Sequence, residues 1–478
     1  MSEELWRWSA VRTADAISTG LISSREAVAS TLERIQQVNP VVNALAEVLA
    51  DEALAAADAA DARRRAGEHL GPLHGVPVTT KINSDQRGLA TTNGVVAFAK
   101  DVAEEDAPHI ENLRTAGAVV VGRSNTPAFS IRWFTDNDLH GRTLNPWDPS
   151  RTPGGSSGGA AAAVATGMGT IAHGNDIGGS IRYPAASCGV VGLRPTPGRV
   201  PSWYGPPEQD QLLGVQTMLV QGPLARSVDD VRLGLRALAT YNPRDPFCVP
   251  APLEGPPLEH PRRVAVLRDV GVAALDPAVD DAVSTAARYF ADAGYEVEEV
   301  QLPLFAEAWR LWWQLVQGVE FEDLARAIDE YGDEAIRRSA DNQFAVTKRM
   351  HGDVALDAYV RGYARRGTLV RELQVFLQRY PVLLTPVSAE RTFEIDADVR
   401  DVDRMEQVIA AQWPMMSLAL LGFPGLSVPV TEGGGLPIGV QLVGPKFRED
   451  LLLDAGRVIE ARNDVATPVT PNCSSEPR

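Results

Sequence analysis

Two glycine-rich strings, PGGSSGG at residues 153–159 and GNDIGGSIR at residues 174–182, lie close together near the middle of the chain. Each holds a serine beside glycines, Ser156 in the first string and Ser180 in the second. Because glycine has no side chain, backbone N–H groups and a substrate carbonyl can approach closely there. Lys81 ends a third segment, GVPVTTK at residues 75–81, which predicts a buried strand. Two serines and a lysine suffice to activate a hydroxyl nucleophile without histidine.

Composition places the chain among ordinary globular proteins. It has 478 residues, of which 44% are hydrophobic and 22% charged, enough for a large core. The net charge of −17 disfavours nucleic acid and anionic membranes as partners. Three widely spaced cysteines and seven scattered histidines give neither a disulfide framework nor a metal-ligand pattern, so we expect no metal and no cofactor. No leader and no membrane-length apolar run are evident, which predicts a cytoplasmic protein.

The apolar pattern alternates between helical and strand periods along the chain. This alternation predicts an α/β fold with a large central mixed β-sheet sandwiched by helices. Helices are predicted over residues 13–36, 51–66, 277–293 and 405–421, and strands over 76–82, 118–122, 190–193, 263–267, 382–386, 426–430 and 438–443.

We expect one domain over residues 1–465 and a C-terminal tail over residues 466–478. Within the domain, residues 1–67 form N-terminal helices and residues 141–200 form the glycine- and serine-rich core. Residues 300–420 form a helical region that shapes the substrate pocket.

Taken together, these segments resemble the amidase signature family of serine hydrolases. Any one of these segments would be weak evidence for the family, but their joint occurrence in this order over about residues 70–450 is a specific signal. The matching pieces are HGVP (74–77) with Lys81, NPWDP (145–149), GGSSGG (154–159), DIGGSIR (176–182), GVVGLRPT (189–196), GPLARS (222–227) and GLPIGVQLVG (435–444).

The resemblance implies a catalytic role for each of three residues. Ser180 takes the position of the nucleophile, Ser156 that of a serine held by a cis peptide bond that relays protons, and Lys81 that of the terminal base. One departure is that Ile82 and Asn83 follow the lysine, where the family often has an acidic residue. The N–H groups implied for the oxyanion hole belong to Ile177, Gly178, Gly179 and Ser180.

The chemistry of a lysine base agrees with this scheme. A free lysine has a pKa of about 10.4. For lysine to act as a base near pH 7, its ammonium form must be destabilised by roughly 4 kcal/mol relative to the neutral amine, and burial can supply this. Lys81 ends an apolar strand with no acid beside it in sequence. Ser157 is expected to hydrogen-bond around the site. Asp176 and Arg182 are expected to form an ion pair that braces the loop.

Aromatic residues outside the glycine strings are candidates for the substrate pocket. Trp309, Trp312 and Trp313 share a helical face, which ordinary core packing would also explain. These aromatics favour a small apolar or aryl amide, with esters and carbamates (urethanes) open to the same acyl chemistry. A monomer or homodimer is expected. The pocket candidates are Trp133, Phe134, Trp203, Tyr204, Trp309 and Trp313.

Three other interpretations compete with this one. In an α/β-hydrolase, Ser156 would be the nucleophile of a G-x-S-x-G elbow, but the preceding NPWDPSRTP cannot be a buried strand, and His173, His260 or His351 would have to supply the base. A nucleotide-binding module lacks its phosphate-binding motifs. The amidase-like subunit of a tRNA-dependent amidotransferase would need partner chains.

Overall fold

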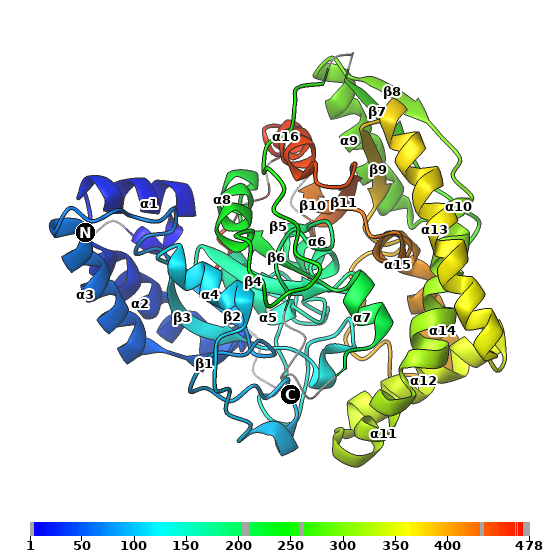
Figure 1. Ribbon diagram of the computed structural model, residues 1–478, viewed down its shortest axis with the longest axis horizontal. Helices are drawn as coiled ribbons and strands as arrows, with labels where there is room; N and C mark the ends of the chain where they lie inside the picture. The colour runs from blue at the N-terminus through cyan, green and yellow to red at the C-terminus, as the bar shows by residue number, and fades with distance from the viewer. Residues whose placement is uncertain are drawn as a thin grey trace.

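One mixed β-sheet organises the molecule. The computed structural model describes residues 4–202, 210–258, 262–430, 435–463, 465 and 467–471. In these residues eleven strands form a single sheet in the order β1-β3-β2-β4-β6-β5-β10-β11-β9-β7-β8, with helices around it (Figure 1), as predicted. The strands are β1 (Leu45–Val48), β2 (Pro77–Lys81), β3 (Val119–Ser124), β4 (Ile171–Asp176), β5 (Val191–Arg194), β6 (Val220–Ala225), β7 (Arg263–Val266), β8 (Glu296–Glu299), β9 (Val382–Pro386), β10 (Gly425–Val430) and β11 (Ile438–Val443).

Helices cover the sheet and extend beyond one end of it. The α-helices in the described residues are α1 (Ala10–Thr19), α2 (Ser24–Val42), α3 (Ala50–Arg65), α4 (Pro108–Thr115), α5 (Gly158–Ala165), α6 (Arg182–Cys188), α7 (Leu213–Met218), α8 (Val228–Leu238), α9 (Pro277–Asp292), α10 (Leu304–Trp312), α11 (Glu322–Tyr331), α12 (Glu334–His351), α13 (Leu356–Arg379), α14 (Val402–Ala411), α15 (Trp413–Leu421) and α16 (Glu449–Glu460). A π-helical stretch, Trp313–Glu320, joins α10 to α11.

The C-terminal hairpin lies in the interior of the sheet. Strand β2 runs parallel to β3 and β4, and β7 runs parallel to β8 and β9. The antiparallel pair β10 and β11 stands between these two groups, because β10 pairs with β5 and β11 pairs with β9. The hairpin therefore connects strands formed before residue 226 to strands formed after residue 262.

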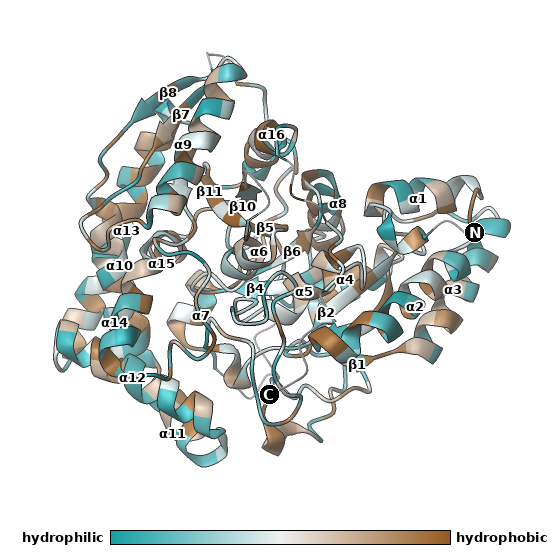
Figure 2. Cartoon of the chain, turned by 180° about the vertical axis from the view of Figure 1, so that it is seen from behind, coloured by the Kyte–Doolittle hydropathy of each residue, from teal (hydrophilic) through white to brown (hydrophobic). Residues whose placement is uncertain are grey.

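The two faces of the sheet have separate cores. Adjacent residues of a strand point to opposite faces. Accordingly Ile171 packs in a cluster with α8, α9 and α16, whereas Ala172 packs in a cluster with α2, α3 and α5. Figure 2 shows apolar residues in the central strands β10 and β11 and hydrophilic residues on outer helices such as α11.

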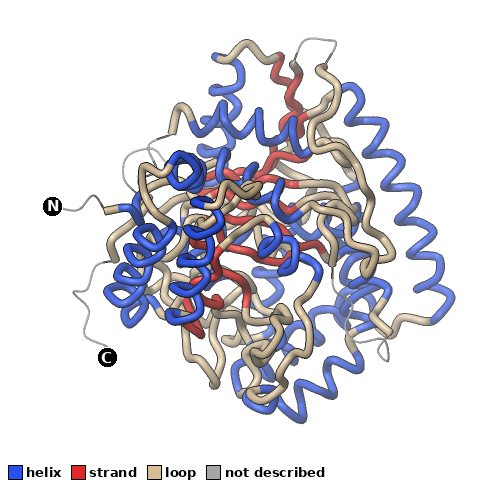
Figure 3. The backbone as a smooth tube through the Cα atoms, turned by 60° about the vertical axis from the view of Figure 1, so that its left-hand side comes forward, coloured by secondary structure: helices blue, strands red, loops and turns tan. Residues whose placement is uncertain are grey.

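A third cluster fills the helical region that was predicted over residues 300–420. It is built mainly by α10 and α12–α15 and contains most of the buried tryptophans. Figure 3 shows the strands running through the middle of the molecule with these helices beside them.

Some predicted boundaries are wrong. The helix predicted over residues 13–36 is two helices, because Gly20 ends α1 in the left-handed region and Ser23 starts α2 with a capping box. Likewise, the single helix predicted over residues 405–421 is two helices in the structure, α14 and α15. In the predicted tail, the amide of Val469 donates to the carbonyl of Ala165 at 2.7 Å, so this part is docked against α5.

Candidate active site

Lys81 stands at the end of β2 with its side chain fully buried. Its Nζ atom lies 2.7 Å from Ser156 Oγ and 2.7 Å from Asn175 Oδ1, donating a hydrogen bond to each. Burial lowers the pKa of Lys81 well below its ordinary value, and the negative charge of Asp176 offsets only part of this effect. Burial therefore favours the neutral form of an amine that is in hydrogen-bond contact with a hydroxyl.

Ser156 lies in the loop that leads into α5. The peptide bond between Gly155 and Ser156 is cis, as the family resemblance implied. Gly155 packs so tightly that a Cβ atom there would lie 2.4 Å from the carbonyl oxygen of Arg132. The glycines of this string are thus required by close packing, which holds Ser156 against Lys81.

Ser180 is brought to the same place by a backbone contact. The amide of Ser157 donates to the carbonyl of Ser180 at 3.2 Å, which joins the two glycine-rich strings. Ser157 Oγ is 3.4 Å from the carbonyl of Asn175, so its side chain supports β4 rather than the reacting atoms. Ser180 precedes α6 and retains 8% exposure.

Asp176 organises the loop from β4 to α6. Its carboxylate accepts hydrogen bonds from the Gly179 amide at 2.9 Å and from both Nε and Nη2 of Arg182, at 2.9 and 2.8 Å. Arg194 makes a second buried ion pair with it at 3.2 Å. Burial alone would raise the pKa of Asp176, but Arg182, Arg194 and the Gly179 amide together hold it well below its ordinary value. The carboxylate is therefore a fixed charge that braces the loop.

One of the four amides predicted for the oxyanion hole already has a hydrogen-bond partner. The N–H of Gly179 is directed to Asp176 Oδ1, so it is not available to a substrate oxygen. No hydrogen bond from the amides of Ile177, Gly178 or Ser180 to another described residue is present. Of the four amides predicted as donors, these three are therefore without a partner among the described residues.

A small cavity, partly open to solvent, adjoins Ser180. Trp133, Trp312, Trp313 and Phe321 provide an aromatic wall, and Met416 adds a flexible apolar contact. The remaining residues around it are Ser130, Ile131, Arg132, Ile177, Gly178, Gln317 and Gln343.

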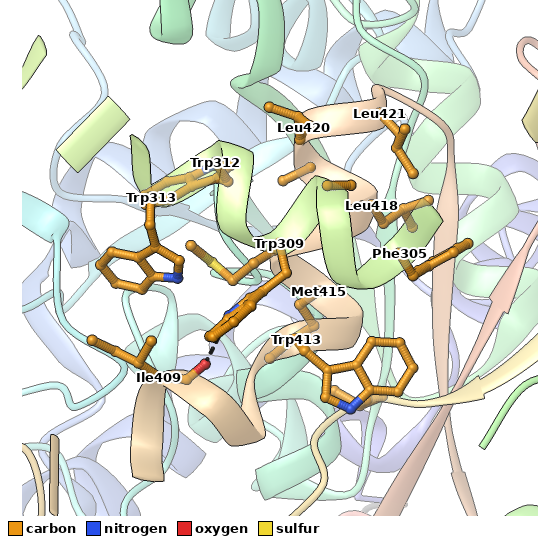
Figure 4. Packing of buried hydrophobic residues seen from close by; sticks show 14 of the residues in the cluster. Phe305, Trp309, Trp312, Trp313, Ile409, Trp413, Met415, Leu418, Leu420 and Leu421 are labelled. Carbon is orange, nitrogen blue, oxygen red and sulfur yellow. Dashed lines mark hydrogen bonds between the residues drawn. The ribbon is translucent and has the colours of Figure 1, made fainter. Parts of the chain in front are cut away.

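The predicted pocket residues divide into three groups. Trp133 and Trp313 line the cavity. Phe134 and Trp309 do not: Phe134 stacks on Phe393 with ring centres 6.0 Å apart, and the indole of Trp309 donates to the carbonyl of Ile409 at 3.2 Å within the core (Figure 4). Trp203 and Tyr204 lie outside the described residues.

Three polar atoms of the residues that line the cavity have no protein partner among the described residues. They are Gln317 Oε1, Arg132 Nη1 and Trp313 Nε1. The other nitrogens of Arg132 bind both carboxylate oxygens of Asp398, at 2.7 and 2.9 Å. A buried polar atom without a partner costs about 1–3 kcal/mol, which a polar substrate group would recover.

Asn175 and Asn83 belong to the site although the motif analysis did not single them out as site residues. Asn175 Nδ2 donates to Asn83 Oδ1 at 3.1 Å, and Asn83 Nδ2 donates to Ser130 Oγ at 3.0 Å. Asn83, two positions after Lys81, thus braces the lysine through the neutral amide of Asn175. Only the position of Asn175 next to Asp176 could have drawn attention to it.

In the described part of the chain, no histidine is hydrogen-bonded to Ser156 or Ser180. His173 Nε2 is 2.9 Å from Gln221 Oε1, and its ring stacks on His109. His351 lies in α12, and His260 is not among the described residues. Since the partner of Ser156 Oγ is Lys81, the structure does not support the α/β-hydrolase alternative.

Metal ligands and membrane-spanning helices are both absent from the part of the chain that the structure describes. It contains no cluster of three or more His, Cys, Asp or Glu side chains suited to a metal ion. None of its helices combines the length and the apolar character that a membrane crossing needs.

Comparison with known proteins agrees with this geometry. The sequence model of the family Amidase matches residues 26–453. The indoleacetamide hydrolase of Bradyrhizobium diazoefficiens is 44% identical over 462 residues, covering 96% of this chain and 87% of the relative. A glutamyl-tRNA(Gln) amidotransferase subunit from Acidothermus cellulolyticus is 34% identical, covering 96% of this chain and 95% of the relative.

Solved structures match as well. A bacterial aryl acylamidase of the amidase signature family has a TM-score of 0.81 at 26% identity, covering 97% of this chain and 96% of that one. The 6-aminohexanoate cyclic dimer hydrolase has a TM-score of 0.81 at 28% identity, covering 97% and 98%. The chain therefore belongs to the amidase signature family and is an amidohydrolase, an enzyme that hydrolyses amide bonds.

Proposed function

We propose that the protein hydrolyses a carboxamide with a flat aromatic acyl group, of the indoleacetamide type, through an acyl-enzyme on Ser180. The observation that carries this proposal is the fully buried Lys81 Nζ, 2.7 Å from Ser156 Oγ and beside the Ser180 loop. The aromatic wall next to Ser180 supports an aryl substrate. So does the name of a relative that is 44% identical.

The proposed reaction begins with neutral Lys81. Ser180 Oγ attacks the substrate carbonyl carbon and gives its proton to Ser156 Oγ, which passes its own proton to Lys81 Nζ. When the C–N bond breaks, the proton returns through Ser156 to the leaving nitrogen, so ammonia departs and an ester to Ser180 remains. Water then attacks this ester by the same proton path and releases the carboxylic acid.

The tetrahedral intermediates carry a negative oxygen that needs fixed donors. The amides of Ile177, Gly178 and Ser180 are the donors in this proposal, because Gly179 is occupied by Asp176. A single such donor is worth about 3–4 kcal/mol in the transition state. The loop carries no reacting side chain besides Ser180, so its contribution is the placement of these amides.

The cavity supports substrate selection by shape and by one polar contact. Trp312, Trp313 and Phe321 offer flat apolar surface to a ring. Gln317 Oε1 has no partner in the described part of the chain and would accept a hydrogen bond from a ring N–H. Esters and carbamates of the same acyl group present the same carbonyl to Ser180 and are secondary substrates in this proposal.

The proposal is tested with the purified chain, indole-3-acetamide, a carbamate of the same aryl group and glutamine. We expect turnover of indole-3-acetamide to be lost in Ser180→Ala and nearly lost in Lys81→Ala. Both variants should still unfold in a cooperative transition, which shows that they are folded. Ser427→Ala, which removes a buried hydroxyl of β10, is the matched control and should keep full activity. Activity that survives Ser180→Ala would contradict the mechanism, and a preference for glutamine would contradict the substrate class.

A glutamine preference would point instead to a component of a tRNA-dependent amidotransferase, since relatives named in that way are 34–37% identical. The lower identity makes this the weaker candidate.

We also propose that residues 1–465 form one catalytic domain, because strands from Leu45 to Val443 share one sheet. In this proposal the domain acts in the cytoplasm as a monomer or homodimer, without nucleic acid, and size-exclusion chromatography tests the oligomeric state.

A further inference from the structure

Two tryptophan side chains hold the loop that carries Ser180. Trp312 Nε1 donates to the carbonyl of Ile177 at 3.1 Å, and Trp133 Nε1 donates to the carbonyl of Gly178 at 3.0 Å. Both rings are buried, with exposures of 5% and 8%, and both line the cavity beside Ser180. The two contacts come from segments that lie 135 and 45 residues from the loop in sequence.

These contacts fix the direction of two N–H groups. In a trans peptide the C=O of one residue and the N–H of the next point in opposite directions. Trp312 therefore fixes the Gly178 N–H, which is one of the free donors. Trp133 fixes the direction of the Gly179 N–H, which donates a hydrogen bond to Asp176 Oδ1 at 2.9 Å.

The loop needs such external contacts because its own sequence gives it little stiffness. Gly178 and Gly179 have no side chains, and Gly179 has a φ of 106°, in a region that other residues rarely adopt. A peptide between two glycines can rotate readily unless both of its polar groups are held. Here an indole holds the oxygen and a carboxylate holds the N–H.

We propose that Trp312 and Trp133 are positioning residues: Trp312 orients the Gly178 N–H as an oxyanion donor, and Trp133 fixes the adjoining Gly178–Gly179 peptide, whose N–H is held by Asp176. Both residues couple this loop geometry to recognition of the substrate ring. The same two rings form the wall against which an aromatic acyl group packs, so a bound ring stabilises the loop geometry. Contacts with the substrate ring then stabilise the transition state in addition to the bound substrate, so they raise kcat. This inference rests on the proposed aryl amide hydrolysis by Ser180.

Neighbouring tryptophans provide matched controls (Figure 4). Trp313 lines the same cavity, but its Nε1 has no partner among the described residues. Trp309 donates its indole N–H to Ile409, away from the cavity. Replacement of each by phenylalanine removes the same indole group without removing a hydrogen bond to the Ser180 loop.

The experiment compares Trp133→Phe, Trp312→Phe, Trp313→Phe and Trp309→Phe. For each variant we measure kcat and KM with indole-3-acetamide and the affinities for indole-3-acetaldehyde and indole-3-acetate. The aldehyde forms a tetrahedral adduct with Ser180 and so needs the oxyanion donors, whereas the acetate reports binding of the ring. The decisive quantity is the ratio of these two affinities.

We expect Trp133→Phe and Trp312→Phe each to lower kcat and the aldehyde-to-acetate ratio by roughly three- to tenfold, the effect of one hydrogen bond. Trp313→Phe should weaken both ligands equally and leave the ratio unchanged. Trp309→Phe should change neither ratio nor kcat. An unchanged ratio in both loop-contacting variants, with turnover still dependent on Ser180, would overturn this inference but leave the proposed function intact.

Wild-type enzyme gives a second test that no folding defect can obscure. At saturation, kcat for indole-3-acetamide should exceed kcat for propionamide by about tenfold or more, because only the first substrate packs against both rings. Equal kcat values would contradict the coupling. Loss of Ser180 dependence would instead contradict the proposed function itself.

Discussion

The amine of Lys81 donates a hydrogen bond to Oδ1 of Asn175 at 2.7 Å, and this partner carries no charge. Asn175 in turn donates to Asn83, so two neutral amides hold the lysine in place. Asp176, which would favour the ammonium form, is already paired with Arg182 and Arg194. Burial therefore dominates, and the pKa of Lys81 stays well below its ordinary value.

A carboxylate at position 175 should move the activity to higher pH. In Asn175→Asp the new negative charge would lie beside Lys81 Nζ and favour its ammonium form, which raises the pKa of the base. We expect kcat/KM at pH 7 to fall at least tenfold and to recover as pH rises. Asn83→Asp, one hydrogen bond further from the amine, should shift the pH profile less. Superimposable profiles of Asn175→Asp and wild type would refute a neutral lysine base.

The buried lysine should make stability depend on pH. Its pKa is depressed in the folded state, so between that value and about 10.4 the unfolded state binds more protons. In this window Lys81 makes the free energy of unfolding rise with pH, by up to about 1.4 kcal/mol per pH unit.

Lys81→Met should remove this contribution. Urea unfolding of wild type and Lys81→Met at pH 7, 8 and 9 gives the slope of the free energy of unfolding against pH for each protein. Lys348→Met, at a side chain that is 73% exposed, should keep the wild-type slope. Equal slopes for wild type and Lys81→Met would show that the folded protein keeps Lys81 protonated.

Removing the charge of Asp176 should destabilise the protein strongly. Asp176→Asn leaves two fully buried arginines, Arg182 and Arg194, without their counter-charge. We expect a loss of about 3–5 kcal/mol in the free energy of unfolding at neutral pH. Asp229→Asn, which removes a half-exposed partner of Arg457, should cost less than about 1 kcal/mol. Similar losses in both variants would mean that the buried cluster is not a special brace.

Gln317 should discriminate between rings with and without an N–H group. Gln317→Leu removes the acceptor Oε1 from the cavity wall while keeping similar volume. We expect KM for indole-3-acetamide to rise about tenfold, and KM for naphthalene-1-acetamide to change little. Gln407→Leu, on an exposed position of α14, is the control. An equal change for both substrates would argue for a packing role only.

The strands and the buried lysine could be predicted because strong local signals mark them. Short β-branched runs predicted β2, β3 and β9–β11, and the apolar run before Lys81 predicted its burial. Strand β6 was missed because Gly222 and Pro223 lie at its centre. Proline donates no ladder hydrogen bond, so sequence rules exclude it from interior strands. Only pairing with β4 and β5 on both sides identifies this segment as a strand.

Side-chain directions in the site could not be predicted from periodicity. Trp133 and Phe134 are adjacent, and the sequence does not tell which ring faces the cavity. Helical spacing groups Trp309 with Trp313, but the helix changes from α to π at Trp313, which alters the angular position of the following residues. The occupied N–H of Gly179 depends on where Asp176 points, which no spacing rule encodes.

The interior position of β10 and β11 has a consequence for synthesis on the ribosome. In a nascent chain that has emerged only to residue 420, strands β1 to β6 and strands β7 to β9 lack the two strands that join them in the finished sheet. Edges that will later be covered, at β5 and at β9, are then exposed and open to pairing with other chains. The sheet can be completed only after Val443 has been translated, so the β10–β11 hairpin is the last part of the sheet that can form.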